Sequence, residues 1–144
     1  MSTAIRKIKN AIKEIKKEVP IRAAKRLEKQ MPKLVENAMN QFYLSYSPTV
    51  YKRTYGLHRG IINGFSTRIS KEGFYITFSS DFIPDHLHDS GEYIFMGAFM
   101  QGIHGTTEVC VSTPPWMIFE DNAIELYEQY ANEEVDKVLK KYDV

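Results

Sequence analysis

The sequence lacks most of the features that mark secreted or membrane-spanning proteins. It contains a single cysteine, Cys110, in 144 residues, so no disulfide can form within the chain, and a reducing compartment is the simpler expectation. No apolar run approaches the roughly 20 residues of a membrane span, and the basic N-terminus lacks the apolar region of a signal peptide. We therefore expect a cytoplasmic protein with no membrane partner, folded as a single domain over residues 1–144.

Motifs for nucleotide binding and catalysis are also missing. The glycine-bracketed turn Gly102–Gly105 has neither a following Lys-Ser/Thr pair nor the G-x-G-x-x-G order of a phosphate-binding loop. Cys110 stands between two valines with no basic neighbour, which favours a small buried hydrophobic residue over a nucleophile paired with His104. His86 and His88 are spaced to hold zinc on an extended chain, yet a closed site needs further ligands, so a polar loop is the favoured interpretation. We expect no catalytic residue, no metal and no cofactor.

Charge is distributed very unevenly along the chain. Residues 1–40 contain eleven Lys or Arg and four Glu, residues 41–111 carry a net −1, and residues 112–144 contain three Lys and eight Asp or Glu. This distribution suits contact with nucleic acid or attraction between copies of the chain, but two solvated helix faces of opposite sign are an equally good interpretation. Base stacking on the basic segment is not expected, because residues 2–41 contain no aromatic residue. The candidate interface residues are Lys9, Lys13, Lys16, Lys17, Glu125, Glu128, Glu133 and Glu134.

The first 46 residues are predicted to form a basic helical arm. Isoleucines and a valine recur at spacings of three and four residues, as on one face of a helix: Ile5, Ile8, Ile12, Ile15 and Val19. Ser2 or Thr3 can cap the first turn. Pro20 predicts a break or kink near Val19, followed by a second helical stretch to Met31. Pro32 either interrupts that stretch or lies in the first turn of a third helix.

Residues 57–111 are predicted to form an antiparallel sheet, because the hydrophobic period shortens there from 3.6 to two. The alternating runs 65–69 and 74–78 are separated by the glycine-containing turn 70–73, which predicts a hairpin. Residues 93–96 and 108–111 are shorter strand candidates.

A helical period returns at residues 116–142. Its apolar stripe consists of Ile118, Phe119, Ala123, Tyr127, Tyr130, Ala131, Val135 and Val138. Basic N-terminal helices, a central antiparallel sheet and a C-terminal amphipathic helix together predict an α+β fold.

One segment resembles a known family. Residues 42–57 read FYLSYSPTVYKRTYGL, and this stretch is similar to a pattern of small neck proteins of long-tailed phages, in which a basic helix ends in an aromatic-rich turn that leads into a sheet. The matching positions are Tyr46, Ser47, Pro48, Tyr51, Arg53, Thr54 and Leu57. Downstream, residues 93–95, 102–105 and 113–115 look like the second half of the same family. The motif also has a plain structural interpretation, in which Pro48 stops the helix and Arg53 bonds the carbonyls at its end.

The resemblance implies a structural phage protein rather than an enzyme. Members join or complete head and tail as a homo-oligomeric ring, so the implied partners are the portal or adaptor, other neck proteins and the tail tube, with non-specific contact to DNA in the channel. The implied location is the neck or tail of the virion, and the host cytoplasm during assembly. Two other classes stay open: a small metal-dependent nuclease that uses His86 and His88, and a basic DNA-binding module.

Overall fold

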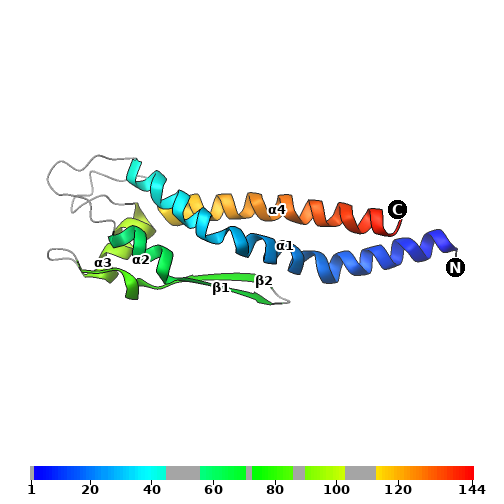
Figure 1. Ribbon diagram of the computed structural model, residues 1–144, viewed down its shortest axis with the longest axis horizontal. Helices are drawn as coiled ribbons and strands as arrows, with labels where there is room; N and C mark the ends of the chain where they lie inside the picture. The colour runs from blue at the N-terminus through cyan, green and yellow to red at the C-terminus, as the bar shows by residue number, and fades with distance from the viewer. Residues whose placement is uncertain (1, 45–55, 71–72, 86–89, 103–112) are drawn as a thin grey trace. The chain divides into compact units, whose positions relative to one another are not determined.

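The computed structural model describes residues 2–44, 56–70, 73–85, 90–102 and 113–144. It is mostly helical with one two-stranded antiparallel sheet, which confirms the predicted α+β fold (Figure 1). In chain order the elements are α1 (Thr3–Leu44), α2 (Gly56–Gly64), β1 (Phe65–Ser70), β2 (Gly73–Phe78), the 3-10 helix η1 (Ser80–Phe82), α3 (Gly91–Ile94), the π-helix η2 (Phe95–Met100) and α4 (Pro115–Lys141).

The chain divides into two compact units. Unit 1 comprises Met1–Gln30, Thr67–Tyr75 and Ala123–Val144, and unit 2 comprises Met31–Ser66 and Ile76–Asn122. Helices α1 and α4 and the hairpin each contribute to both units, so neither unit is one continuous stretch of sequence. The single domain over residues 1–144 therefore stays a prediction.

Helix α1 runs without interruption through both of its prolines, so the break that Pro20 predicts near Val19 does not occur, and the alternative of a kink stays a prediction. Pro20 and Pro32 are exposed, and each removes one backbone hydrogen bond from the interior of the helix. Val19 and Ala23, on either side of Pro20, are buried. Because most helical stability in proteins comes from packing of an apolar face, this burial outweighs the local cost of the proline. Ser2 caps the helix as expected, since its Oγ accepts a hydrogen bond from the Ile5 amide at 3.2 Å.

The hairpin is the element that the sequence predicts best. In β1 the half-buried side chains alternate with exposed ones, and β2 continues the same alternation from Phe74 to Phe78. On the exposed face, the hydroxyls of Ser66 and Thr77 are hydrogen-bonded across the two strands at 2.6 Å. A period of two with a short glycine-containing turn was therefore sufficient evidence for this element.

Two segments that were assigned to the sheet are helical instead. Residues 56–64 form α2, in which Gly60 lies against η1: a Cβ there would stand 2.6 Å from Ile83 Cγ1. Residues 93–96 lie in α3 and η2 rather than in a strand. Ser90 caps α3, because its Oγ accepts a hydrogen bond from the Tyr93 amide at 3.2 Å. The other short strand candidate, residues 108–111, lies outside the described residues.

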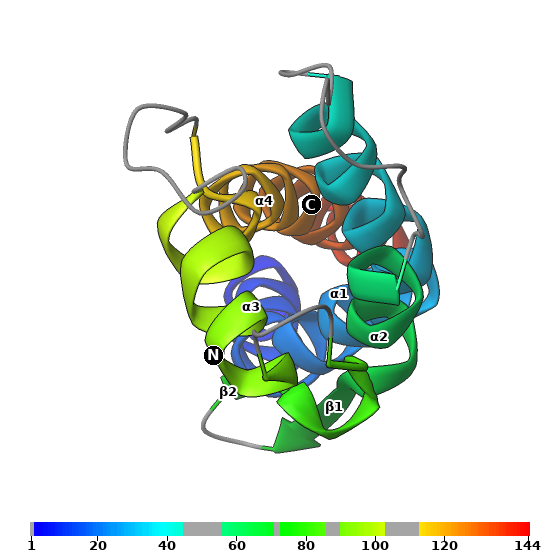
Figure 2. The same ribbon diagram turned by 90° about the vertical axis from the view of Figure 1, so that its left-hand side faces the viewer.

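Unit 2 is built around phenylalanines from four elements. Phe78 of β2 packs at ring-centroid distances of 4.7 Å from Phe99 of η2 and 5.6 Å from Phe119 of α4. Phe95 stacks on Phe99, and Phe65 of β1 lies beside Phe78. Element η1 contacts both α2 and α3, which are labelled in Figure 2.

Candidate functional site

In unit 1 the first part of α1 and the last part of α4 lie side by side and run antiparallel (Figure 1). Their apolar contact is small: Ala11 and Val19 of α1 and Val138 of α4 form the buried cluster, with Ile15 and Tyr142 among the side chains at its edge. Charged side chains make up much of the remaining contact. We call this row of ion pairs between α1 and α4 the charged seam, and it is the strongest candidate site among the described residues.

Glu14 is the centre of the seam at the N-terminal side of α1. Its Oε1 accepts hydrogen bonds from Arg22 Nη2 at 3.1 Å and from Lys141 Nζ at 2.9 Å. Its Oε2 is buried and has no hydrogen-bond partner. Near the ends of the two helices, Lys7 and Asp143 form an exposed ion pair at 3.7 Å. Glu14 thus connects two turns of α1 with the last turn of α4.

Arg26 is the second centre of the seam. Its guanidinium bonds the carboxylates of Glu133 and Glu134, the latter at 3.2 Å, and lies over the ring of Tyr130 with 4.1 Å to the ring centroid. Glu134 is 6% exposed and also accepts a hydrogen bond from Lys137 at 3.2 Å. A planar guanidinium with several fixed donors suits this simultaneous recognition of two carboxylates and a ring. The arrangement specifies which residues of α1 and α4 stand opposite each other.

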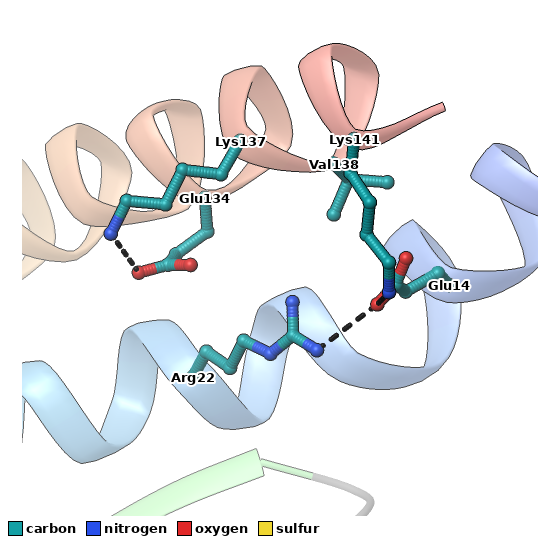
Figure 3. Close-up of a pocket in the computed structure, with 6 residues that line it drawn as sticks. All are labelled: Glu14, Arg22, Glu134, Lys137, Val138 and Lys141. Atoms are coloured by element: carbon teal, nitrogen blue, oxygen red, sulfur yellow. Dashed lines mark hydrogen bonds and ion pairs between the residues drawn. The ribbon is translucent and has the colours of Figure 1, made fainter. Parts of the chain in front are cut away.

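A shallow hollow of about 340 Å³ lies over the seam (Figure 3). Its lining consists of Glu14, Arg22, Glu134, Lys137, Val138 and Lys141. The view shows that each of the five charged side chains is engaged with another member of the lining: Glu14 with Arg22 and Lys141, and Glu134 with Lys137. Small-molecule sites are usually apolar with a few convergent polar groups. The charged lining of the hollow is therefore typical of a polar contact between two helices rather than of a small-molecule site.

The ion pairs shift the pKa values of their members. The hydrogen bond from Lys141 is the main cause that holds the pKa of Glu14 below its ordinary value, against the opposing effect of burial. Arg26 likewise lowers the pKa of Glu133, and Glu133 raises that of Arg26. Glu14 in turn raises the pKa of Lys141. These shifts favour the charged forms of Glu14, Glu133, Arg26 and Lys141.

The candidate interface residues fall into two sets. Lys9, Lys13, Lys16 and Lys17 are exposed on α1, and Glu125 and Glu128 are exposed on α4. Glu133 and Glu134, in contrast, bind Arg26 of the same chain. The basic N-terminal and acidic C-terminal segments therefore form ion pairs within one chain. Both segments also expose charged side chains to solvent.

Sequence reasoning missed Glu14, Arg22 and Arg26 as site residues. A signal for Arg26 was present at Glu134, which stands four residues after Tyr130 and four before Val138 on the predicted apolar stripe of α4. A carboxylate on such a stripe is buried on folding and needs a cation from the facing element. The periodic pattern indicates that the cation exists but does not identify its position in α1.

Several predicted residues lie outside the described residues. These are Tyr46, Ser47, Pro48, Tyr51, Arg53 and Thr54 of the family motif, together with His86, His88, His104 and Cys110. Leu57, the last motif residue, is half-buried in α2. Across the described ranges, no group of three or more His, Cys, Asp or Glu side chains could hold a metal ion. None of the helices in those ranges is long and apolar enough to cross a membrane. Comparison with known proteins finds no matching family model, no matching curated protein and no matching solved structure.

Proposed function

We propose that this chain is a structural, non-enzymatic protein of the neck or tail end of a long-tailed phage. Copies of it form a ring that joins or completes head and tail during assembly, in contact with the portal or adaptor, other neck proteins or the tail tube. The observation that carries the proposal is the motif of residues 46–57, whose first residue follows the end of α1 by two positions and whose last residue lies in α2.

The arrangement around the motif supports this proposal. A basic helix precedes the motif, and α2 leads directly into β1, so the order of helix, motif and sheet agrees with the pattern of the neck proteins apart from the short helix between motif and sheet.

A phage that carries this gene with an amber mutation provides the test. In a non-suppressing host we expect lysates that contain DNA-filled heads and separate tails under the electron microscope, because the joint between them is incomplete. The same phage in a suppressing host is the control and should yield complete particles. Complete, infectious particles in the non-suppressing host would contradict the proposal.

A direct assay distinguishes the nuclease alternative from the proposed structural role. Incubation of the purified protein with DNA and RNA, with and without zinc or magnesium, should show no turnover. Turnover that disappears when both His86 and His88 are changed to alanine would favour the enzyme.

A further inference from the structure

The first turns of α1 carry a row of isoleucines that the fold leaves exposed. Ile5, Ile8 and Ile12 are 48%, 44% and 47% exposed, respectively, although their spacing predicts burial. Their exposure places this row outside the contact that Ala11, Ile15 and Val19 make with α4, although a rotation of about 100° per residue projects Ile8 close to Ile15 and Val19. The packed residues Ala11, Ile15 and Val19 are four positions apart. The packed face therefore rotates away from the isoleucines as α1 is followed toward its N-terminus. We call Ile5, Ile8 and Ile12 the isoleucine row.

Positive charge borders the row on its outer side. Lys9 and Lys16 are exposed, and they lie next to the row on the side away from the buried face of α1. Pairing of this surface with the same surface of a second α1 would bring like charges together. Its partner must therefore be apolar at the centre and acidic at the side.

The outer face of α4 in unit 1 has that composition. Ile124 is 51% exposed and lies beside the buried face of Ala123 and Val138. Glu125 and Glu128 border it on the outer side and are both exposed, and within the described ranges neither forms an ion pair with another side chain. The order from buried face to apolar residue to charge is the same as in α1, with the opposite sign of charge.

We propose that the isoleucine row of one copy binds the Ile124 face of α4 in a second copy, with Lys9 and Lys16 opposite Glu125 and Glu128. Charge complementarity selects this occupant, because the same chain presents both halves of the contact. The two faces differ, so the contact is heterologous and can propagate from copy to copy until it closes as a ring. The inference rests on the proposed function for the expectation that copies assemble, and it names the surface through which they do so.

Charge reversal in purified full-length protein tests the contact by sedimentation velocity over a range of concentrations. The wild type should associate, whereas a basic-face variant (Lys9→Glu with Lys16→Glu) and an acidic-face variant (Glu125→Lys with Glu128→Lys) should each associate at least tenfold more weakly. A mixture of the two variants should associate again, because each then presents a face that complements the other. The matched control, Lys25→Glu with Lys29→Glu, reverses two exposed lysines on another side of α1 and should associate like the wild type.

The apolar part of the contact is tested by Ile5→Ser, Ile8→Ser and Ile12→Ser together. Serine and isoleucine have similar helix propensities, so helicity should be retained while association weakens at least tenfold. A wild type that stays monomeric at every concentration, or a mixture that fails to associate, would overturn the inference. Sequence-independent binding of duplex DNA that is lost in the basic-face variant, without self-association, would identify nucleic acid as the partner instead. These results are independent of the amber test, so either proposal can fail alone.

Discussion

Glu14 shows how much of unit 1 depends on single charges. One of its oxygens accepts hydrogen bonds from Arg22 and Lys141, and the other is buried without a partner. Burial of that oxygen is unfavourable for the charged form, and the two cations compensate for it. Glu134 is in a similar position, buried between Arg26 and Lys137. Removal of one partner leaves such a carboxylate with one cation in place of two, so the seam is sensitive to substitution on either helix.

The lowered pKa of Glu14 predicts how stability depends on pH. Because the folded state has the lower pKa, Glu14 stabilises the fold above its ordinary pKa of 4.5, and this contribution is lost as the pH falls through the folded-state value. We therefore expect Glu14→Gln to lower the Tm at pH 7. The deficit should disappear in acid, where the carboxylate of the wild type is itself protonated. Thermal melts followed by circular dichroism over a pH series provide the measurement.

Glu36→Gln serves as the control for this experiment, because Glu36 is an exposed carboxylate of the same helix. It should melt like the wild type at each pH. A Tm deficit of Glu14→Gln that persists unchanged in acid would show that the side chain acts by shape rather than by charge.

At the scale of elements, the sequence predicts those helices and strands that local residue patterns determine. It does not predict those whose structure depends on contacts between residues distant in sequence. Alternation identified the hairpin, and the 3.6-residue period identified α4. Pro20 does not break α1, because residues of α4 that are distant in sequence pack against the helix and stabilise it. Residues 93–96 were predicted as a strand although Ser90 is a good N-cap, because the aromatic and β-branched residues of this short segment are typical of strands.

Pro20 provides a quantitative test at this scale. It lies in the interior of α1 and is exposed, so alanine there restores a backbone hydrogen bond and removes no buried contact. We expect Pro20→Ala to raise the free energy of unfolding by up to about 3 kcal/mol. Urea denaturation followed by circular dichroism measures the change.

Pro84, which lies outside the helices, is the matched control, and Pro84→Ala should give no gain. A Pro20→Ala variant that is less stable than the wild type would mean that α1 needs the local geometry that proline imposes.

At the scale of the whole molecule, the basic and acidic ends have two uses that the sequence alone does not separate. Some of the charged side chains form ion pairs within the chain: Arg26 pairs with Glu133 and Glu134, and Glu14 pairs with Lys141. Other charged residues, including Lys9 and Lys16 on α1 and Glu125 and Glu128 on α4, are displayed to solvent. Periodicity gives both helices but not their relative register, so the division between internal and external charge required the structure.

The same division decides how the N-terminal segment is tested. Residues 2–19 contain Ala11, Glu14 and Val19, which pack or pair with α4. Deletion of this segment would expose Val138 and leave Lys141 without Glu14, so loss of assembly would have two causes. Substitutions at Lys9 and Lys16 change only the outer face and are the cleaner experiment.

The central proposal is that this chain is a structural component of a phage particle. Quantitative mass spectrometry of purified particles tests it most directly. Particles of a phage that encodes the chain should contain it in several copies for each portal ring. That ratio should survive high-salt washing, because the apolar part of the proposed contact is not screened by salt. Purified, infectious particles that contain none of the chain would contradict the account.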